Sequence, residues 1–89
     1  MKYATFTMAN MDTTCNIAAY KFTHVDAPAL LAGALQPQAQ QRALKGTVLL
    51  AEEGINLFLA GSSEAIHDFL AWLRQDARFA DLEVKESFS

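Results

Sequence analysis

Two apolar runs on either side of a short acidic turn form the clearest pattern in the chain. The runs are Thr47–Ala51 and Ile55–Ala60, and residues 52–54 separate them. Branched, aromatic and large aliphatic side chains favour strands, and glycine adopts the positive φ that a tight turn often needs. The pattern predicts a β-hairpin at the centre of the fold, whose turn motif is Glu53, Gly54 and Asn56.

Alternation ahead of the hairpin predicts another strand, over residues 16–23. Successive side chains of a strand point to opposite faces, so Tyr20 and Phe22 share one face and Lys21 takes the other. We expect the two aromatic residues to face the core and Lys21 to face away from the helices.

A helix is expected between this strand and the hairpin. Asp26 is its expected N-cap, and Pro28 fits in its first turn. Proline lacks an N–H donor and disfavours helix at the residue before it, so the helix is expected to kink or pause at Pro37. Residues 38–44 are expected to resume as a second helical piece.

The segment after the hairpin predicts a second helix and a last strand. Ser62 or Ser63 supplies an N-cap, and Glu64 suits the positive end of the helix dipole. Large apolar residues then recur at helical spacing and form an amphipathic stripe; they are Ile66, Phe69, Leu70 and Leu73. The last strand is expected over Leu82–Phe88.

The predicted order of elements, β-α-β-β-α-β, is that of a ferredoxin-like α+β fold. Its strands form one four-stranded antiparallel sheet in the order 4-1-3-2, with both helices on one face. The other face stays open, and there we expect Lys21, Asn56, Phe58 and Lys85. We expect one domain over residues 16–89 and a flexible leader over residues 1–15.

The composition is typical of a small cytoplasmic domain. Of its 89 residues, 52% are hydrophobic and 19% are charged, and the net charge is −3. This acidic balance argues against strong nucleic-acid affinity by the domain alone, because free-standing binders are usually basic. The single cysteine excludes an intrachain disulfide, and no His or Cys spacing predicts a metal site. No stretch has the length and apolarity of a membrane span.

The sequence offers no pair of residues for acid–base or nucleophilic catalysis. Adjacent Glu52 and Glu53 would point to opposite sides of a strand and cannot face each other across a substrate. Cys15 has no neighbouring cation to activate it, so an inert thiol is expected. His24 and His67 are expected to be solvated. We therefore expect no catalytic residue, metal or cofactor in this chain.

Phe58, expected between Lys21 and Lys85 on the open face, is the best hint of a binding surface. Four-stranded sheets use such aromatic and basic side chains to stack and hold RNA bases. The RNA-recognition motif, with aromatics on both central strands, is not expected here. An exposed Phe also suits contact with another domain or a second copy. Packing against another domain ranks first, ahead of RNA contact and homodimerisation.

Four segments resemble one known family. They are NIAAYKF (16–22), KGTVLLAEEGIN (45–56), AGSSEAI (60–66) and LAWLRQDARFADLEVKESFS (70–89). In this order and spacing they resemble the N-terminal domain of the rhodanese-like tRNA uridine hydroxylases. The resemblance implies an acylphosphatase-like fold of ferredoxin type, in agreement with the pattern above. The sequence departs from the family after Asn56, where Leu57 and Phe58 stand in place of Gly-Thr.

The resemblance also implies a parent enzyme, an oxidoreductase that uses oxygen to hydroxylate the wobble uridine of certain tRNAs at carbon 5. The reactive cysteine of that family lies in a rhodanese domain that follows this one, and Cys15 does not match its position. We expect the present chain to be an accessory domain without that catalytic domain. Acylphosphatase activity is not implied, because the loop at residues 23–26 has no arginine to bind phosphate.

The leading hypothesis is a noncatalytic domain that helps a tRNA-modifying enzyme to hold tRNA or to position its rhodanese domain. The candidate RNA-binding residues are Lys21, Lys45, Lys85, Arg42 and the stacking residue Phe58. The alternative is a self-association or protein-interaction module that acts through the open sheet face or an edge strand. A weak homodimer is one form that it could take.

Overall fold

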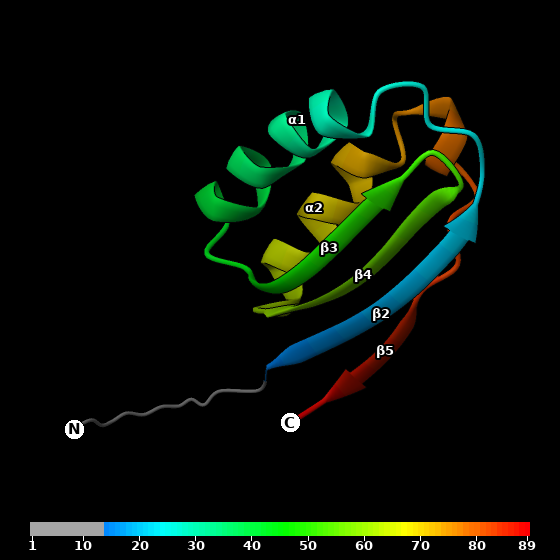
Figure 1. The fold of residues 1–89 in the computed structure, drawn as a ribbon. Helices are drawn as coiled ribbons and strands as arrows, with labels where there is room; N and C mark the ends of the chain where they lie inside the picture. The colour runs from blue at the N-terminus through cyan, green and yellow to red at the C-terminus, as the bar shows by residue number, and fades with distance from the viewer. Residues whose placement is uncertain (1–13) are drawn as a thin grey trace.

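The computed structural model describes residues 14–89 and has one sheet with two helices (Figure 1). The strands are β2 (Cys15–Phe22), β3 (Lys45–Ala51), β4 (Gly54–Gly61) and β5 (Lys85–Phe88). The helices are α1 (Pro28–Gln41), α2 (Ser63–Leu73) and the short 3-10 helix η1 (Ala77–Phe79). The order of strands and long helices is the predicted βαββαβ.

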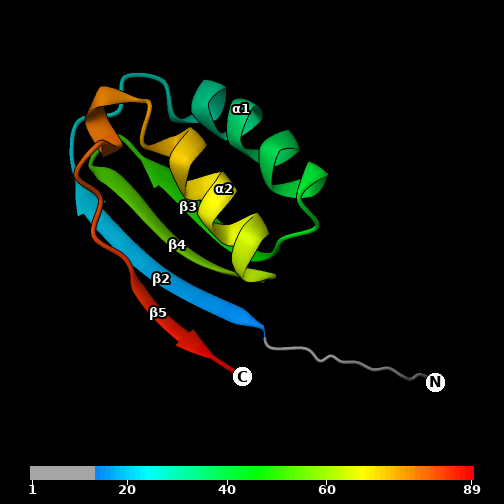
Figure 2. The same ribbon diagram turned by 180° about the vertical axis from the view of Figure 1, so that it is seen from behind.

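The four strands form one antiparallel sheet in the order β3-β4-β2-β5. This is the predicted 4-1-3-2 order read from the other edge, so the strands β2 and β4 occupy the centre. Both long helices cover the same face of the sheet (Figure 2). The predicted ferredoxin-like α+β fold is confirmed.

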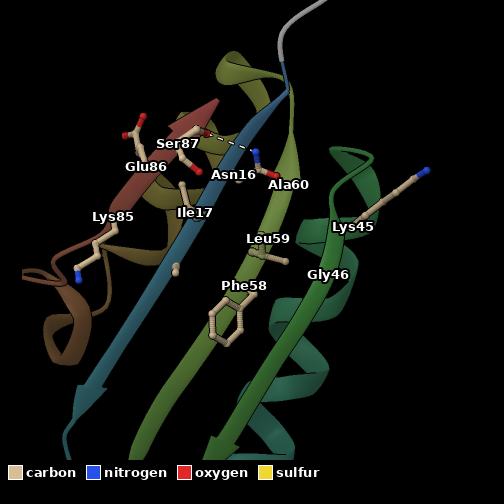
Figure 3. Close-up of a pocket in the computed structure, with 11 residues that line it drawn as sticks. Asn16, Ile17, Lys45, Gly46, Phe58, Leu59, Ala60, Lys85, Glu86 and Ser87 are labelled. Atoms are coloured by element: carbon tan, nitrogen blue, oxygen red, sulfur yellow. Dashed lines mark hydrogen bonds between the residues drawn. The ribbon is translucent and has the colours of Figure 1, made fainter. Parts of the chain in front are cut away.

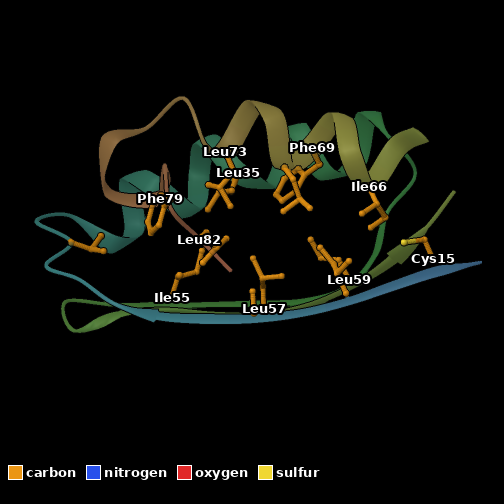
Figure 4. Close-up of a cluster of buried hydrophobic side chains, with 14 residues drawn as sticks. Cys15, Leu35, Ile55, Leu57, Leu59, Ile66, Phe69, Leu73, Phe79 and Leu82 are labelled. Atoms are coloured by element: carbon orange, nitrogen blue, oxygen red, sulfur yellow. The ribbon is translucent and has the colours of Figure 1, made fainter. Parts of the chain in front are cut away.

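The core lies between the sheet and the helices (Figure 4). Alternate residues of β4 point into it, and α2 contributes its apolar stripe as predicted; the buried residues of these two elements are Ile55, Leu57, Leu59, Ile66, Phe69, Leu70 and Leu73. The Ser62 hydroxyl caps α2 by accepting a hydrogen bond from the Ala65 N–H at 3.1 Å. Burial of each large apolar side chain contributes about 1.5–3 kcal/mol.

The face of β2 that meets the core is the opposite of the predicted one. Ile17 and Ala19 are buried, whereas Tyr20 and Phe22 are 68% and 81% exposed. The placement of these two aromatic residues in the core was therefore wrong. Pairing with β4 sets Ile17 opposite the buried Leu59, and a shift of one residue would turn every side chain of β2 to the other face.

Lys21 consequently lies on the helix side of the sheet, and its predicted place on the open face was wrong. Its Nζ donates a hydrogen bond to the Arg78 carbonyl at 2.7 Å and forms an ion pair with Asp81. The lysine stem thus ties the end of β2 to the segment around η1. The ammonium group is already engaged by protein acceptors.

Helix α1 begins one residue later than predicted. Its N-cap is Ala27, with no side-chain hydrogen bond, and Pro28 is the first helical residue. The Asp26 carboxylate instead lies 2.6 Å from Nε2 of His24. The prediction of Asp26 as N-cap was wrong because the neighbouring histidine engages its carboxylate.

The predicted pause at Pro37 is absent, since α1 is continuous from Pro28 to Gln41. Pro37 is exposed, and Leu35 and Ala39 on either side of it pack against the core. Packing on both sides keeps the helix intact where proline removes one backbone hydrogen bond. Tertiary contacts here outweigh local preference.

The first strand begins at Cys15, one residue earlier than predicted. Of the leader expected over residues 1–15, residues 1–13 lie outside the described part of the chain. Thr14 exchanges two backbone hydrogen bonds with Ser89, each 3.0 Å long. Between residues 14 and 89, no helix is long and apolar enough to cross a membrane.

Candidate nucleic-acid interface

The open face of the sheet consists of the side chains that point away from α1 and α2. The strand registers place alternate residues of all four strands on it. They are Asn16, Ala18, Tyr20, Phe22, Lys45, Thr47, Leu49, Asn56, Phe58, Ala60, Lys85 and Ser87. Asn56, Phe58 and Lys85 lie on this face as predicted.

Both central strands contribute an aromatic ring to the open face. Phe58 of β4 is 58% exposed and pairs with Ala18, whose small side chain leaves the ring uncovered. Tyr20 lies two residues further along β2, so it is a diagonal neighbour of Phe58 across the strand pair. Its ring packs edge-on against Phe22, with 5.9 Å between centroids. Aromatic residues on both central strands were not expected from the sequence.

Two lysines flank Phe58 from the two edges of the sheet. Lys45 is the first residue of β3 and Lys85 the first of β5, and with Phe58 they line a hollow of about 500 Å³. Figure 3 shows the Phe58 ring on β4 between these two side chains. Within residues 14–89 neither lysine forms an ion pair. Their charges are therefore available to a bound anion.

The other two candidate cations lie elsewhere. Lys21 is engaged on the helix side, where its hydrogen bond holds the pKa of Asp81 below the ordinary value. Arg42 caps the end of α1 and donates to the Gln38 carbonyl and side-chain oxygens at 3.0 and 2.7 Å. Its Nε also lies 3.8 Å from an Asp68 carboxylate oxygen. Both residues hold elements of the fold together instead of facing the hollow.

The hairpin turn joins the sheet to the loop that leads into α1. Gly54 has φ +152°, and a Cβ there would lie 2.0 Å from the Lys21 carbonyl oxygen, so only glycine fits without displacement. The Glu53 carbonyl accepts a hydrogen bond from the Thr23 N–H at 3.0 Å. Asn56 of the predicted turn motif lies on the open face, opposite Tyr20.

The large apolar residues of the open face that were not expected there from the sequence lie at its hairpin end. Tyr20, Phe22 and Leu49, which is 60% exposed, line a second hollow of about 270 Å³ together with Asn56 and Glu53. The signal in the sequence was the presence of apolar residues at both alternating positions of residues 17–22. Such a strand is apolar on both faces, which favours a covered or ligand-binding surface.

The one cysteine lies in a small polar cluster on the helix side. Burial and the nearby Glu86 carboxylate raise the pKa of the Cys15 thiol, whose Sγ lies 3.7 Å from Glu86 Oε1. His67 approaches the other oxygen of Glu86 at 3.2 Å. A buried, protonated thiol is a poor nucleophile. In the part of the chain that the structure describes, no three His, Cys, Asp or Glu residues converge to hold a metal.

Comparison with known proteins yields one family model and several close relatives. The model of the UPF0176 acylphosphatase like domain matches residues 14–89. Proteins named tRNA uridine(34) hydroxylase from Bordetella parapertussis, Bordetella avium and Xanthomonas campestris are 62%, 66% and 60% identical over 79, 74 and 74 residues. These matches cover 89%, 83% and 83% of this chain but 33%, 31% and 29% of the relatives. The chain thus spans about a third of the length of the curated relatives that it matches.

Proposed function

Because the chain belongs to the UPF0176 acylphosphatase-like domain family, as its four sequence segments predicted, we propose that it is the noncatalytic accessory domain of a tRNA uridine(34) hydroxylase and that its open sheet face holds RNA. The relatives that bear this name extend well beyond the matched part. The reaction itself is assigned to the remainder of such a protein. In agreement with this, Cys15, the one thiol among residues 14–89, is buried and stays protonated because its pKa is raised.

The observation that carries the proposal is the pair of exposed rings on the two central strands, Tyr20 and Phe58. Lys45 and Lys85 line a hollow with Phe58, and Tyr20 lines a neighbouring hollow with Phe58 and Lys85. Sheets of this topology bind single-stranded RNA by stacking two or three bases on aromatic rings of the central strands. Lysines at the rim neutralise the phosphates that connect those bases. The open face has both components in neighbouring positions.

Unpaired nucleotides in a tRNA loop are the substrate class that fits this face. Their bases are free to splay out and stack, whereas those of a duplex are not. Position 34 lies in the anticodon loop, so the same loop would present neighbouring nucleotides to Tyr20 and Phe58. Because the net charge is −3 and two lysines face the hollow, the expected binding is modest and depends on stacking more than on charge.

The hairpin end of the open face supports a second role, the positioning of the rest of the parent protein. Phe22 and Leu49 are 81% and 60% exposed, and the hollow that they line is mostly apolar, with Lys21 and Glu53 as its charged residues. Apolar patches of this kind usually pack against another protein surface. The longer relatives contain the additional chain that such a contact requires.

A nuclear magnetic resonance titration of the chain with an anticodon stem–loop RNA tests the RNA-holding role. The expected result is shifts of backbone amides in β2 and β4 around Tyr20 and Phe58, and of Lys45 and Lys85. With two phosphate contacts, the slope of log K against log salt concentration should be about −1.4. Shifts confined to α1 and α2, or no shifts at high RNA concentration, would contradict the proposal.

A further inference from the structure

Asn56 is an exposed amide near the centre of the open face. The strand registers set it opposite Tyr20 on β2 and opposite Leu49 on β3, and Phe58 follows two residues later on the same strand. Directly opposed Cβ atoms lie about 4.5–5.5 Å apart, and positions two residues apart on one strand lie about 7 Å apart. The amide is therefore a close neighbour of both rings proposed to stack bases.

Asn56 also lies where two hollows of the open face adjoin. It lines the hollow of about 270 Å³ at the hairpin end together with Tyr20 and Leu49. It lines a second hollow, of about 740 Å³, together with Tyr20 and Phe58. A planar base in either hollow therefore has the Asn56 amide beside it.

The side chain of Asn56 forms no hydrogen bond with any of residues 14–89. The second amide of the open face differs in this respect. Asn16 Nδ2 donates to the Ser89 hydroxyl at 3.1 Å and to the Ser87 carbonyl at 3.4 Å. Asn16 thus ties β2 to the end of β5, whereas the donor and the acceptor of Asn56 are both available to a ligand.

A side-chain amide is complementary to the pairing edge of uracil. The amide places an N–H donor beside a C=O acceptor. The Watson–Crick edge of uracil has the N3–H donor between two carbonyl acceptors, O2 and O4, so an amide can form two hydrogen bonds with it on either side of N3. The same edge of cytosine, adenine or guanine offers only one such arrangement. Proteins commonly recognise unpaired bases through this edge.

We propose, on the basis of the RNA-holding function proposed above, that Asn56 binds the Watson–Crick edge of a uracil stacked on Tyr20 or Phe58. Its Oδ1 accepts a hydrogen bond from N3–H, and its Nδ2 donates to O2 or O4. Stacking alone tolerates every base, and contacts from Lys45 and Lys85 to phosphates carry no sequence information. Asn56 therefore gives the open face its preference among bases.

Fluorescence anisotropy with three labelled oligonucleotides tests this role. They are tetrauridylate, tetracytidylate and a tetrauridylate methylated at every N3. The methylated base retains a ring that stacks but lacks the N3–H donor. The wild-type chain should bind tetrauridylate about tenfold more tightly than the methylated form, because the two hydrogen bonds to Asn56 are lost.

Two substitutions of Asn56 separate the donor from the acceptor. Asn56→Leu keeps the approximate size of the side chain but removes both groups, so it should bind the two uracil forms with affinities within about twofold of each other. Asn56→Asp retains acceptors alone. It should prefer tetracytidylate to tetrauridylate, because a carboxylate accepts from the cytosine amino group and repels the uracil carbonyls.

Asn16→Leu is the matched control, because it removes an amide of the same face that is already engaged by Ser87 and Ser89. It should leave the ratio of the affinities for the two uracil forms unchanged. Equal wild-type affinity for both forms would overturn the role of Asn56 and leave the RNA-holding face intact. So would a preference that Asn56→Leu retains. No binding of any oligonucleotide at about 1 mM would overturn the RNA-holding face and the role of Asn56 together.

Discussion

Tyr20 and Phe58 are the two residues on which the proposed RNA contact depends most. Replacement of either by alanine should weaken binding of an anticodon stem–loop about tenfold, because stacking of a base on a ring contributes about 1–3 kcal/mol. Both side chains are more than half exposed, so the free energy of unfolding should hardly change. Fluorescence anisotropy with labelled RNA measures the affinity.

Phe88→Ala is the matched control for this prediction. Phe88 has the same exposed fraction as Phe58, 58%, but it pairs with the buried Cys15 and so lies on the helix side of the sheet. Its loss should leave RNA affinity unchanged. Equal losses for Phe58→Ala and Phe88→Ala would show that the contact does not depend on the open face.

Cys15 should be protected from thiol reagents in the folded chain. Its side chain is fully buried, and burial and Glu86 raise its thiol pKa. Labelling by a chromogenic disulfide at pH 8 should be at least about 100-fold slower than in denaturant, since it requires an opening of the structure. Fast labelling of the folded chain would contradict the burial of Cys15 in the core.

The raised pKa of Cys15 determines how its contribution to the free energy of unfolding changes with pH. The thiol stays neutral longer in the folded state, so the unfolded chain loses its proton first as the pH rises. The Cys15 contribution to the free energy of unfolding should therefore fall as the pH rises above the ordinary thiol pKa of about 8.5.

The side chains that proved hardest to place from the sequence are those of β2. Its residues 17–22 contain apolar side chains at both alternating positions, so periodicity alone did not distinguish the buried face. The larger side chains of Tyr20 and Phe22 were the ones expected to be buried, but the register with β4 buries the smaller Ile17 and Ala19. Lys21 was misplaced by the same one-residue choice. Lys45, Phe58 and Lys85 line one hollow of the open face, whereas Lys21 and Arg42 form hydrogen bonds elsewhere.

At the scale of elements, two glycines should respond to alanine in opposite directions. Gly54→Ala brings a Cβ against the Lys21 carbonyl at a positive φ and should cost more than about 2 kcal/mol of unfolding free energy. Gly33 lies within α1 and has open space around it, so Gly33→Ala should add about 0.5–1 kcal/mol. Urea denaturation compares them, and a destabilised Gly33→Ala would argue against a continuous α1.

Helix η1 should contribute a stability that disappears in acid. Asp76 caps it by accepting from the Arg78 N–H at 2.9 Å and pairs with the Arg78 guanidinium at 2.7 Å, which lowers the pKa of the Asp76 carboxyl. A lowered folded pKa contributes stability that is complete above about pH 5 and is lost as the pH falls through the folded pKa. The Asp76→Asn variant should be about 0.5–1 kcal/mol less stable at pH 7.

Denaturation of both proteins at pH 7 and near pH 3 checks this dependence. The difference in unfolding free energy should shrink at the lower pH, where the wild-type carboxylate takes up a proton. A constant difference at both values would mean that the Asp76→Asn variant loses a contact unrelated to charge.

The local sequence predicted some helices and strands better than others. Helix α2 could be predicted because a serine cap and four apolar residues at helical spacing coincide in it. Helix α1 is apolar on several sides and buries only Leu35 fully. Its pattern therefore predicted neither its N-cap residue nor its continuation through Pro37. Packing of Leu35 and Ala39 keeps α1 continuous through Pro37, whereas the Asp26 carboxylate contacts His24 instead of capping the helix. The hairpin was predicted because its glycine and its two apolar runs indicate the same structure.

On the scale of the whole molecule, the order of elements was enough to predict the topology, since short connections and right-handed crossovers leave few alternatives. The function of the open face could not be predicted from the order of elements. It depends on which of two apolar faces of β2 meets the helices. That choice places aromatic rings on both central strands and favours RNA contact over packing against another domain, which ranked first from the sequence.

Photo-crosslinking tests whether the open face of the sheet contacts RNA. An anticodon stem–loop with 4-thiouridine at position 34 or its neighbours would be irradiated with the chain, and the crosslinked residues identified by mass spectrometry. The proposal predicts crosslinks to Tyr20 and Phe58, which are lost when unlabelled RNA competes. Crosslinks confined to α1 or α2, or none at saturating RNA, would contradict an RNA-holding open face.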